Sequence, residues 1–324
     1  MLSAFQKFGR SMRIYLQTRD GLVQLVNWQS GQATGLGLSL HCSFVVRRSV
    51  NPEPHRCTLS ILGLSKRRRE QILKAYDEAE EMSWTMRSAL KAGRIRVDAG
   101  YGDDVATLFV GDIAPDGVTS DWVGPGHVMK IEALDGRIAW KGRFVNKASS
   151  KGVDIKTIRQ VIAASGDYMA GKDAKFVFEK NFPGLVKKKV GFPGYESGYA
   201  IFGESRKHNR QLCAELGIRP FFQDGEVRYM SDDAALLDKA VVLSQEKGGV
   251  LLRASPTGLG RYSARTLMEH RLRPGRQVIL RDRYGIIIGP GLYRVESMVA
   301  AGGNRVRDYN VDVDLTPTKL GGGA

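Results

Sequence analysis

Three pairs of adjacent carboxylates are the residues of this sequence best suited to acid–base chemistry. Asp103-Asp104, Glu80-Glu81 and Asp232-Asp233 are candidates for the paired acids with which hydrolases cleave sugar polymers. They stand in turn-rich segments or on the exposed side of an expected helix, and no pattern brings them to one cleft. A Gly-x-Ser-x-Gly nucleophile motif is also absent, so we do not expect a hydrolase or another enzyme.

The histidines, cysteines and glycines do not form a ligand pattern either. The five histidines are never two or four residues apart, and the three cysteines contain no Cys-x-x-Cys pair. Gly35-Leu36-Gly37 lacks the third glycine of a dinucleotide loop, and no phosphate-binding Gly-Lys-Ser/Thr motif occurs. The sequence therefore predicts no catalytic residue, no metal and no cofactor.

A long stretch between Lys172 and Arg210 interleaves basic and aromatic residues. Such a stretch can stack the bases of a nucleic-acid single strand over a cationic groove. It is equally typical of a subunit interface, where aromatic anchors are surrounded by a basic rim. The residues we expect at an interface are Phe176, Phe178, Phe182, Lys187, Lys188, Lys189, Phe192 and Tyr195.

Composition is that of a globular protein with an excess of positive charge. The chain has 324 residues, 42% hydrophobic and 26% charged, enough for roughly two domains. Its net charge of +15 favours acidic partners, which include nucleic acid, membrane surfaces and acidic proteins. No apolar run approaches the roughly 20 residues of a membrane span, and the N-terminus lacks a secretory signal. We expect synthesis in a cytoplasm and no membrane contact.

The elements predict a mainly β protein with α insertions (α+β): two small β-barrels joined by a small α/β insert. Residues 1–150 form the first barrel, 151–238 the insert, 239–317 the second barrel and 318–324 a flexible tail. Strands of the first barrel are expected at 13–28 (a hairpin around Asp20-Gly21), 38–49, 57–62, 94–99, 107–113 and 127–134. Ser65 is placed to cap a helix that continues to about residue 92.

The rest of the chain is expected to form the insert and the second barrel. The insert is expected to contain helices at 154–164 and from Ser205 to Gly217, then a hairpin at 221–230. Strands of the second barrel are expected at 240–244, 276–281, 285–288, 292–298 and 309–315.

The order of these motifs resembles the baseplate hub family of contractile-tailed phages, and is similar to the N-terminal part of type VI secretion spike proteins. The motifs are Cys57–Gly63 with the Leu64-Ser65 helix start, Arg94–Tyr101, Leu108–Ile113, Ala133–Gly136, Leu212–Gly217, Phe221–Tyr229, Leu267–Leu280 and Gly291–Val295. Within them, the positions expected to set turns and barrel packing are Gly100, Tyr101, Phe109, Gly111, Asp135, Gly136, Pro274 and Gly275.

The resemblance implies a structural virion protein. It implies a homotrimeric ring in the tail baseplate, made in the host cytoplasm, which adapts a six-fold tail tube to a three-fold spike. The implied partners are the tail tube protein, the central spike protein, the tape-measure protein and, transiently, DNA that passes through the lumen. Because the flanking sequence points to an assembly, we favour an interface for the basic aromatic stretch. The alternative is a small-barrel protein that binds single-stranded nucleic acid.

Overall fold

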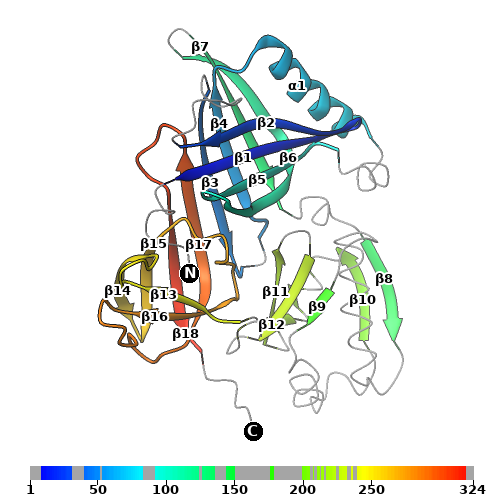
Figure 1. Cartoon of the computed structure of the whole chain (residues 1–324). Coiled ribbons are helices and arrows are strands. Elements are labelled where there is room, and N and C mark those ends of the chain that lie inside the picture. The colour runs from blue at the N-terminus through cyan, green and yellow to red at the C-terminus, as the bar shows by residue number, and fades with distance from the viewer. Residues whose placement is uncertain are drawn as a thin grey trace.

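The computed structural model is mostly β-structure. It describes residues 9–30, 40–51, 53–82, 92–123, 126–135, 144–149, 176–178, 199–204, 217–223, 226–231 and 239–318, with isolated positions between 207 and 235. These residues form one 13-stranded sheet, a two-stranded sheet, a three-stranded sheet and the helix α1 (Lys66–Glu81) (Figure 1).

The large sheet is an open path of antiparallel neighbours. Its order is β14 (Leu251–Gly258), β15 (Arg261–Leu267), β18 (Asn310–Pro317), β17 (Tyr293–Gly303), β3 (His41–Ser49), β4 (Arg56–Leu62), β7 (Gly126–Leu134), β6 (Asp104–Val123), β5 (Arg94–Tyr101), β1 (Arg10–Thr18) and β2 (Gly21–Gln29). Beside it, β13 (Val241–Ser244) pairs in parallel with β16 (Gln277–Arg281), which joins β17.

The two small sheets come from the middle of the chain. One pairs β8 (Phe144–Ser149) with β10 (Tyr199–Glu204). The other places β12 (Glu226–Ser231) between β11 (Ile218–Gln223) and β9 (Phe176–Phe178). The expected hairpin at 221–230 is therefore present as β11 and β12. The expected helix at 154–164 lies outside the described residues, as does most of the helix after Ser205.

The expected pair of closed barrels is not confirmed. Among the described strands the path is open, from β14 at one end to β2 at the other. The two β-rich parts merge because β3 and β17 pair directly, from Ser297↔Ser49 to Gly303↔Ser43. The described part of the sheet curls, and β1 and β2 cross over β3 and β4 in Figure 1.

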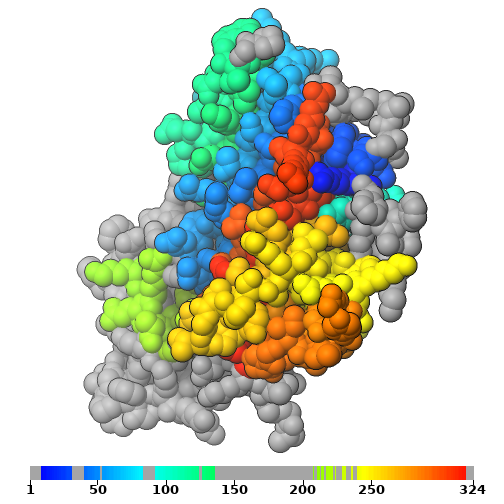
Figure 2. All heavy atoms as spheres, turned by 90° about the vertical axis from the view of Figure 1, so that its left-hand side faces the viewer, coloured from blue at the N-terminus to red at the C-terminus, as the bar shows by residue number. Residues whose placement is uncertain are grey.

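One hydrophobic core serves strands from both ends of the sequence. Fully buried side chains include Ile14 of β1, Leu59 of β4 and Phe109 of β6, and the same cluster contains Tyr293 of β17 and Val311 of β18. Burial alternates along β4 and β18, as expected of strands with one face on a core. In Figure 2 the red C-terminal strands lie against the blue N-terminal ones.

Helix α1 begins where the sequence predicts and ends early. Ser65 caps it, because its side-chain oxygen accepts a hydrogen bond from the Arg68 N–H at 3.4 Å. The helix ends at Glu81 rather than near residue 92, since Met82 has extended backbone (φ −64°, ψ 141°). No helix of the described chain is long and apolar enough to cross a membrane.

Candidate functional site

Two tyrosines join the N-terminal strands to the C-terminal ones. The rings of Tyr101 and Tyr309 meet edge to face with centroids 5.5 Å apart. The Tyr101 hydroxyl donates to the backbone carbonyl of Tyr309 and accepts from the Met268 N–H, each at 3.2 Å. Residues more than 160 positions apart in the chain are thus held together by hydrogen bonds inside the core.

The Tyr309 hydroxyl forms hydrogen bonds with paired residues of β1 and β5. It donates to the Ser11 carbonyl and accepts from the Gly100 N–H at 3.2 Å, and Ser11 and Gly100 are paired across the strands. Burial raises the pKa of Tyr309, so the hydroxyl stays neutral and keeps both contacts. Arg10 covers the ring at 5.4 Å from its centroid.

Two of the predicted motif glycines, Gly100 and Gly111, occupy positions where a side chain does not fit. A Cβ at Gly100 would lie 1.9 Å from the Asp104 carbonyl oxygen, and one at Gly111 would lie 2.5 Å from the Phe109 ring. Gly275 has φ +79° and donates its N–H to the Val295 carbonyl at 2.8 Å. The neighbouring Pro274 is buried, and Gly136 lies outside the described residues. Their importance for assembly stays a prediction.

Asp135, another predicted motif residue, lies in a buried polar cluster with His55. The Asp135 N–H donates to the His55 carbonyl at 2.8 Å. The His55 ring contacts the Ser49 carbonyl through Nε2 at 2.8 Å, and its Nδ1 lies 3.6 Å from the Asp135 carboxylate. Both side chains are only 1–2% exposed. Sequence reasoning missed His55, because the loop before β4 carries no recognisable motif.

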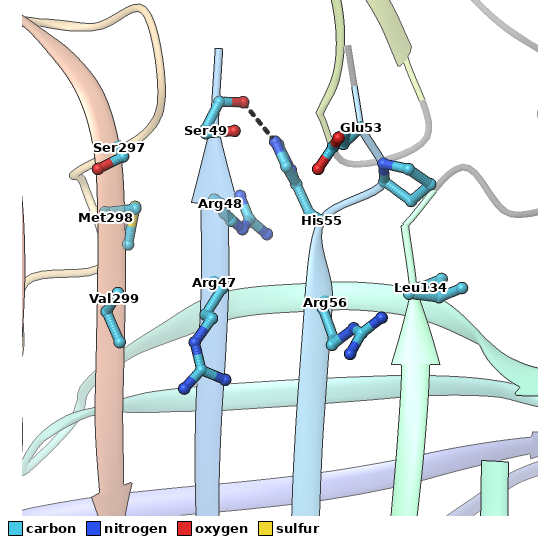
Figure 3. A pocket seen from close by; sticks show the side chains of 11 residues that line it. Arg47, Arg48, Ser49, Glu53, His55, Arg56, Leu134, Ser297, Met298 and Val299 are labelled. Atoms are coloured by element: carbon cyan, nitrogen blue, oxygen red, sulfur yellow. Dashed lines mark hydrogen bonds between the residues drawn. The ribbon is translucent and has the colours of Figure 1, made fainter. Parts of the chain in front are cut away.

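A pocket of about 610 Å³ opens beside this cluster, where β17, β3 and β4 meet the end of β7 (Figure 3). Its lining residues are Arg47, Arg48, Ser49, Glu53, Pro54, His55, Arg56, Leu134, Ser297, Met298 and Val299. The lining combines arginine side chains with apolar walls, which suits recognition of an acidic and partly apolar group.

The other predicted site residues that the structure describes are not brought together. Asp104, at the start of β6, lies 3.8 Å from His270, whereas Glu80 and Glu81 lie at the end of α1. Asp232 and Asp233 lie outside the described residues. Among the residues that the structure describes, no group of three histidines, cysteines or carboxylates is placed to hold a metal ion.

Most residues of the predicted interface lie outside the residues that the structure describes. Phe176 and Phe178 belong to β9, which pairs with β12, but their side chains are not described. The remaining members, Phe182, Lys187, Lys188, Lys189, Phe192 and Tyr195, lie outside the described residues.

Comparison with known families connects this fold to phage tails. Residues 23–181, just under half of the chain, match the family described as Baseplate hub gp41. The chain resembles a baseplate hub protein. The resemblance expected from the order of the sequence motifs is confirmed. Comparison with curated protein sequences gives no significant match.

Solved structures share the fold of this hub-like chain over nearly its whole length. A tail protein from Neisseria meningitidis MC58 has a TM-score of 0.52 at 9% identity, covering 95% of this chain and 96% of that one. The 43 kDa tail protein of prophage MuSo2 from Shewanella oneidensis has a TM-score of 0.54 at 8% identity, covering 94% and 97%.

A third similar structure belongs to a secretion system. The c3393 protein of E. coli, described as a type VI secretion component similar to the T4 tail proteins gp27 and gp5, has a TM-score of 0.54. It is 11% identical and covers 88% of this chain and 76% of that chain. The matched family is described as a baseplate hub, and these structures are described as tail proteins and a secretion-system component.

Proposed function

We propose that the chain is a baseplate hub subunit that forms a homotrimeric ring in the virion tail. The ring would adapt the six-fold tail tube to the three-fold central spike, with the tape-measure protein and transiting DNA as further contacts. The observation that carries this proposal is the match of residues 23–181 to a baseplate hub family. The same fold in two tail proteins over at least 94% of this chain supports it.

Most of the exposed large apolar side chains come from one segment of the chain, which contains β13, β14 and the loop after β16. Of the ten large hydrophobic residues exposed in the described chain, six lie between positions 242 and 287: Val242, Leu252, Leu259, Tyr284, Ile286 and Ile287. Exposed apolar side chains, where they adjoin, are typical of protein–protein contacts. We therefore place a subunit interface in this segment, with the curled ends of the sheet as the barrel-like walls of the ring.

The oligomeric state tests the proposal. Analytical ultracentrifugation should give three times the 35.7 kDa of the chain. The double variant Leu259→Ser/Ile286→Ser should weaken the trimer, whereas Leu22→Ser, which removes an exposed apolar side chain from β2 at the far end of the sheet, should not. A monomer at every concentration, with and without the spike protein, would contradict the proposed ring.

The net charge of +15 favours one alternative, binding of single-stranded nucleic acid. That function predicts tight binding to a single strand and a steep loss of affinity as salt is added. The hub predicts weak binding that does not depend on sequence.

A further inference from the structure

One row of cross-strand neighbours has paired charges at both ends and two adjacent arginines at its centre. In register the row reads Arg265, Asp312, Val299, Arg47, Arg56, Leu134, Asp112 and Arg94. Residues directly opposite each other on neighbouring strands share one face and lie about 5 Å apart. Neighbours in this row are therefore placed to pair their charges.

Both outer arginines of the row have a carboxylate. Arg265 makes two hydrogen bonds to Asp312, at 2.7 and 2.8 Å. At the other end, Arg94 Nε lies 3.1 Å from the Asp112 carboxylate. Opposite charges on adjacent strands are the arrangement that stabilises a sheet.

The two central arginines have no carboxylate directly opposite them on a neighbouring strand. Arg47 and Arg56 are directly opposite each other on β3 and β4, and like charges in that position are destabilising. Arg47 is exposed, and no ion pair or hydrogen bond of its side chain occurs among the described residues. Arg56 lies 3.9 Å from Glu132, but both side chains are about half exposed, so this ion pair contributes little.

Both central arginines line the 610 Å³ pocket. In Figure 3 they come from neighbouring strands at the same end of the pocket, with Val299 beside Arg47. The walls include the apolar side chains of Pro54, Leu134 and Val299. Two adjacent arginines that line a pocket suit an anionic group, because the bound group supplies the missing counter-charge.

We propose that this pocket binds an acidic segment of a partner protein, with a carboxylate bridging Arg47 and Arg56 and an apolar side chain against Val299 and Leu134. Protein is favoured over nucleic acid because the lining is partly apolar, and Leu134, Met298 and Val299 can pack against an apolar side chain of a peptide but not against a phosphate backbone. The inference deepens the proposed function and rests on it in one respect: the partner is a neighbouring tail protein.

Fluorescence anisotropy of the purified full chain provides the test. The probe is a fluorescein-labelled hexapeptide of alternating Glu and Leu, and a Gln–Leu hexapeptide is the neutral comparison. The Glu–Leu probe should bind saturably, and Arg47→Ala/Arg56→Ala should weaken its binding about tenfold or more. Arg253→Ala/Arg261→Ala removes the same charge from exposed positions on β14 and β15, and should change binding by less than about twofold.

Thermal unfolding separates a binding role from a structural one. Because Arg47 and Arg56 repel each other, the double alanine variant should melt at or above the wild-type temperature while losing the peptide. A large fall in melting temperature would mean that the pair is structural.

Two other outcomes would overturn the inference. One is equal loss of peptide binding in both double variants. The other is tighter binding of a six-nucleotide thymidine strand that depends on the same two arginines, which would assign the pocket to nucleic acid. If the protein is a trimer that does not bind the peptide, the proposed peptide site is wrong and the proposed hub function stands. If it is a monomer that binds the peptide, the peptide site stands and the proposed trimeric hub is wrong.

Discussion

Removing a single oxygen atom from Tyr309 should measurably weaken the whole fold. In Tyr309→Phe the Ser11 carbonyl and the Gly100 N–H each lose a hydrogen-bond partner inside the core, where water does not replace it. A buried polar group left without a partner costs roughly 1–3 kcal/mol, so we expect a loss of about 2 kcal/mol in the free energy of unfolding. The aromatic ring remains, which limits the change to the hydroxyl.

Urea denaturation followed by circular dichroism measures this loss. Tyr284→Phe is the matched control, because it removes the same atom from a side chain that is 70% exposed, and should change stability by less than about 0.5 kcal/mol. Since Tyr309 joins strands from both ends of the chain, we also expect one cooperative transition. Equal stability of the two variants, or separate transitions for two halves, would refute the role assigned to this hydroxyl.

Three further predictions follow from the packing and titration of buried groups. Gly111→Ala should destabilise the fold by about 1–3 kcal/mol in the same denaturation assay, because the new methyl group meets the Phe109 ring, whereas Gly9→Ala, with its nearest atom at 3.7 Å, should be tolerated. Burial opposes ionisation of Glu269, but hydrogen bonds and charge from Arg271 outweigh it and lower the pKa of Glu269. The stability that this carboxylate contributes is present above its ordinary pKa and lost as pH falls through the lowered one, so the deficit of Glu269→Gln should shrink in urea titrations below about pH 4.5. Burial raises the pKa of Cys42 to about 12 and also raises the pKa of the other two cysteines, so dithionitrobenzoate should modify no thiol in the native protein and all three after denaturation.

Local signals in the sequence predicted the elements that depend on neighbouring residues. The Asp20-Gly21 dipeptide predicted the hairpin of β1 and β2, and the structure places its turn at Arg19-Asp20, with Gly21 at φ +135°. Ser65 marked the start of α1 because N-capping needs only a side chain three residues before its donor.

Edge and bulged strands were harder to predict. The β14–β15 hairpin was missed because β14 is an edge strand whose side chains are mostly exposed and which contains Pro256, so it lacks apolar alternation. The expected strand at 285–288 is only an isolated bridge between Arg281 and Ile287. Strand β6 continues through Pro115 to Val123, past the expected end at Ile113, because the register shift between Ile113 and Val118 accommodates Asp116 at φ +52°.

The other features that the sequence did not predict depend on long-range strand pairing. The seven-residue pairing of β3 with β17 joins segments about 250 positions apart, and no local pattern specifies it. That pairing joins the two β-rich parts of the chain into one sheet, and it brings Val299 beside Arg47 to form the pocket. The candidate pocket could therefore not be read from the sequence, although Arg47 lies in a predicted strand and Arg56 directly precedes the one predicted at 57–62.

The position of the protein in the virus particle tests the central claim most directly. Intact particles would be labelled with a gold-conjugated antibody against this chain and imaged by electron microscopy. A baseplate hub predicts label confined to the distal end of the tail. Unlabelled particles, with the protein left in the soluble lysate, would contradict the account.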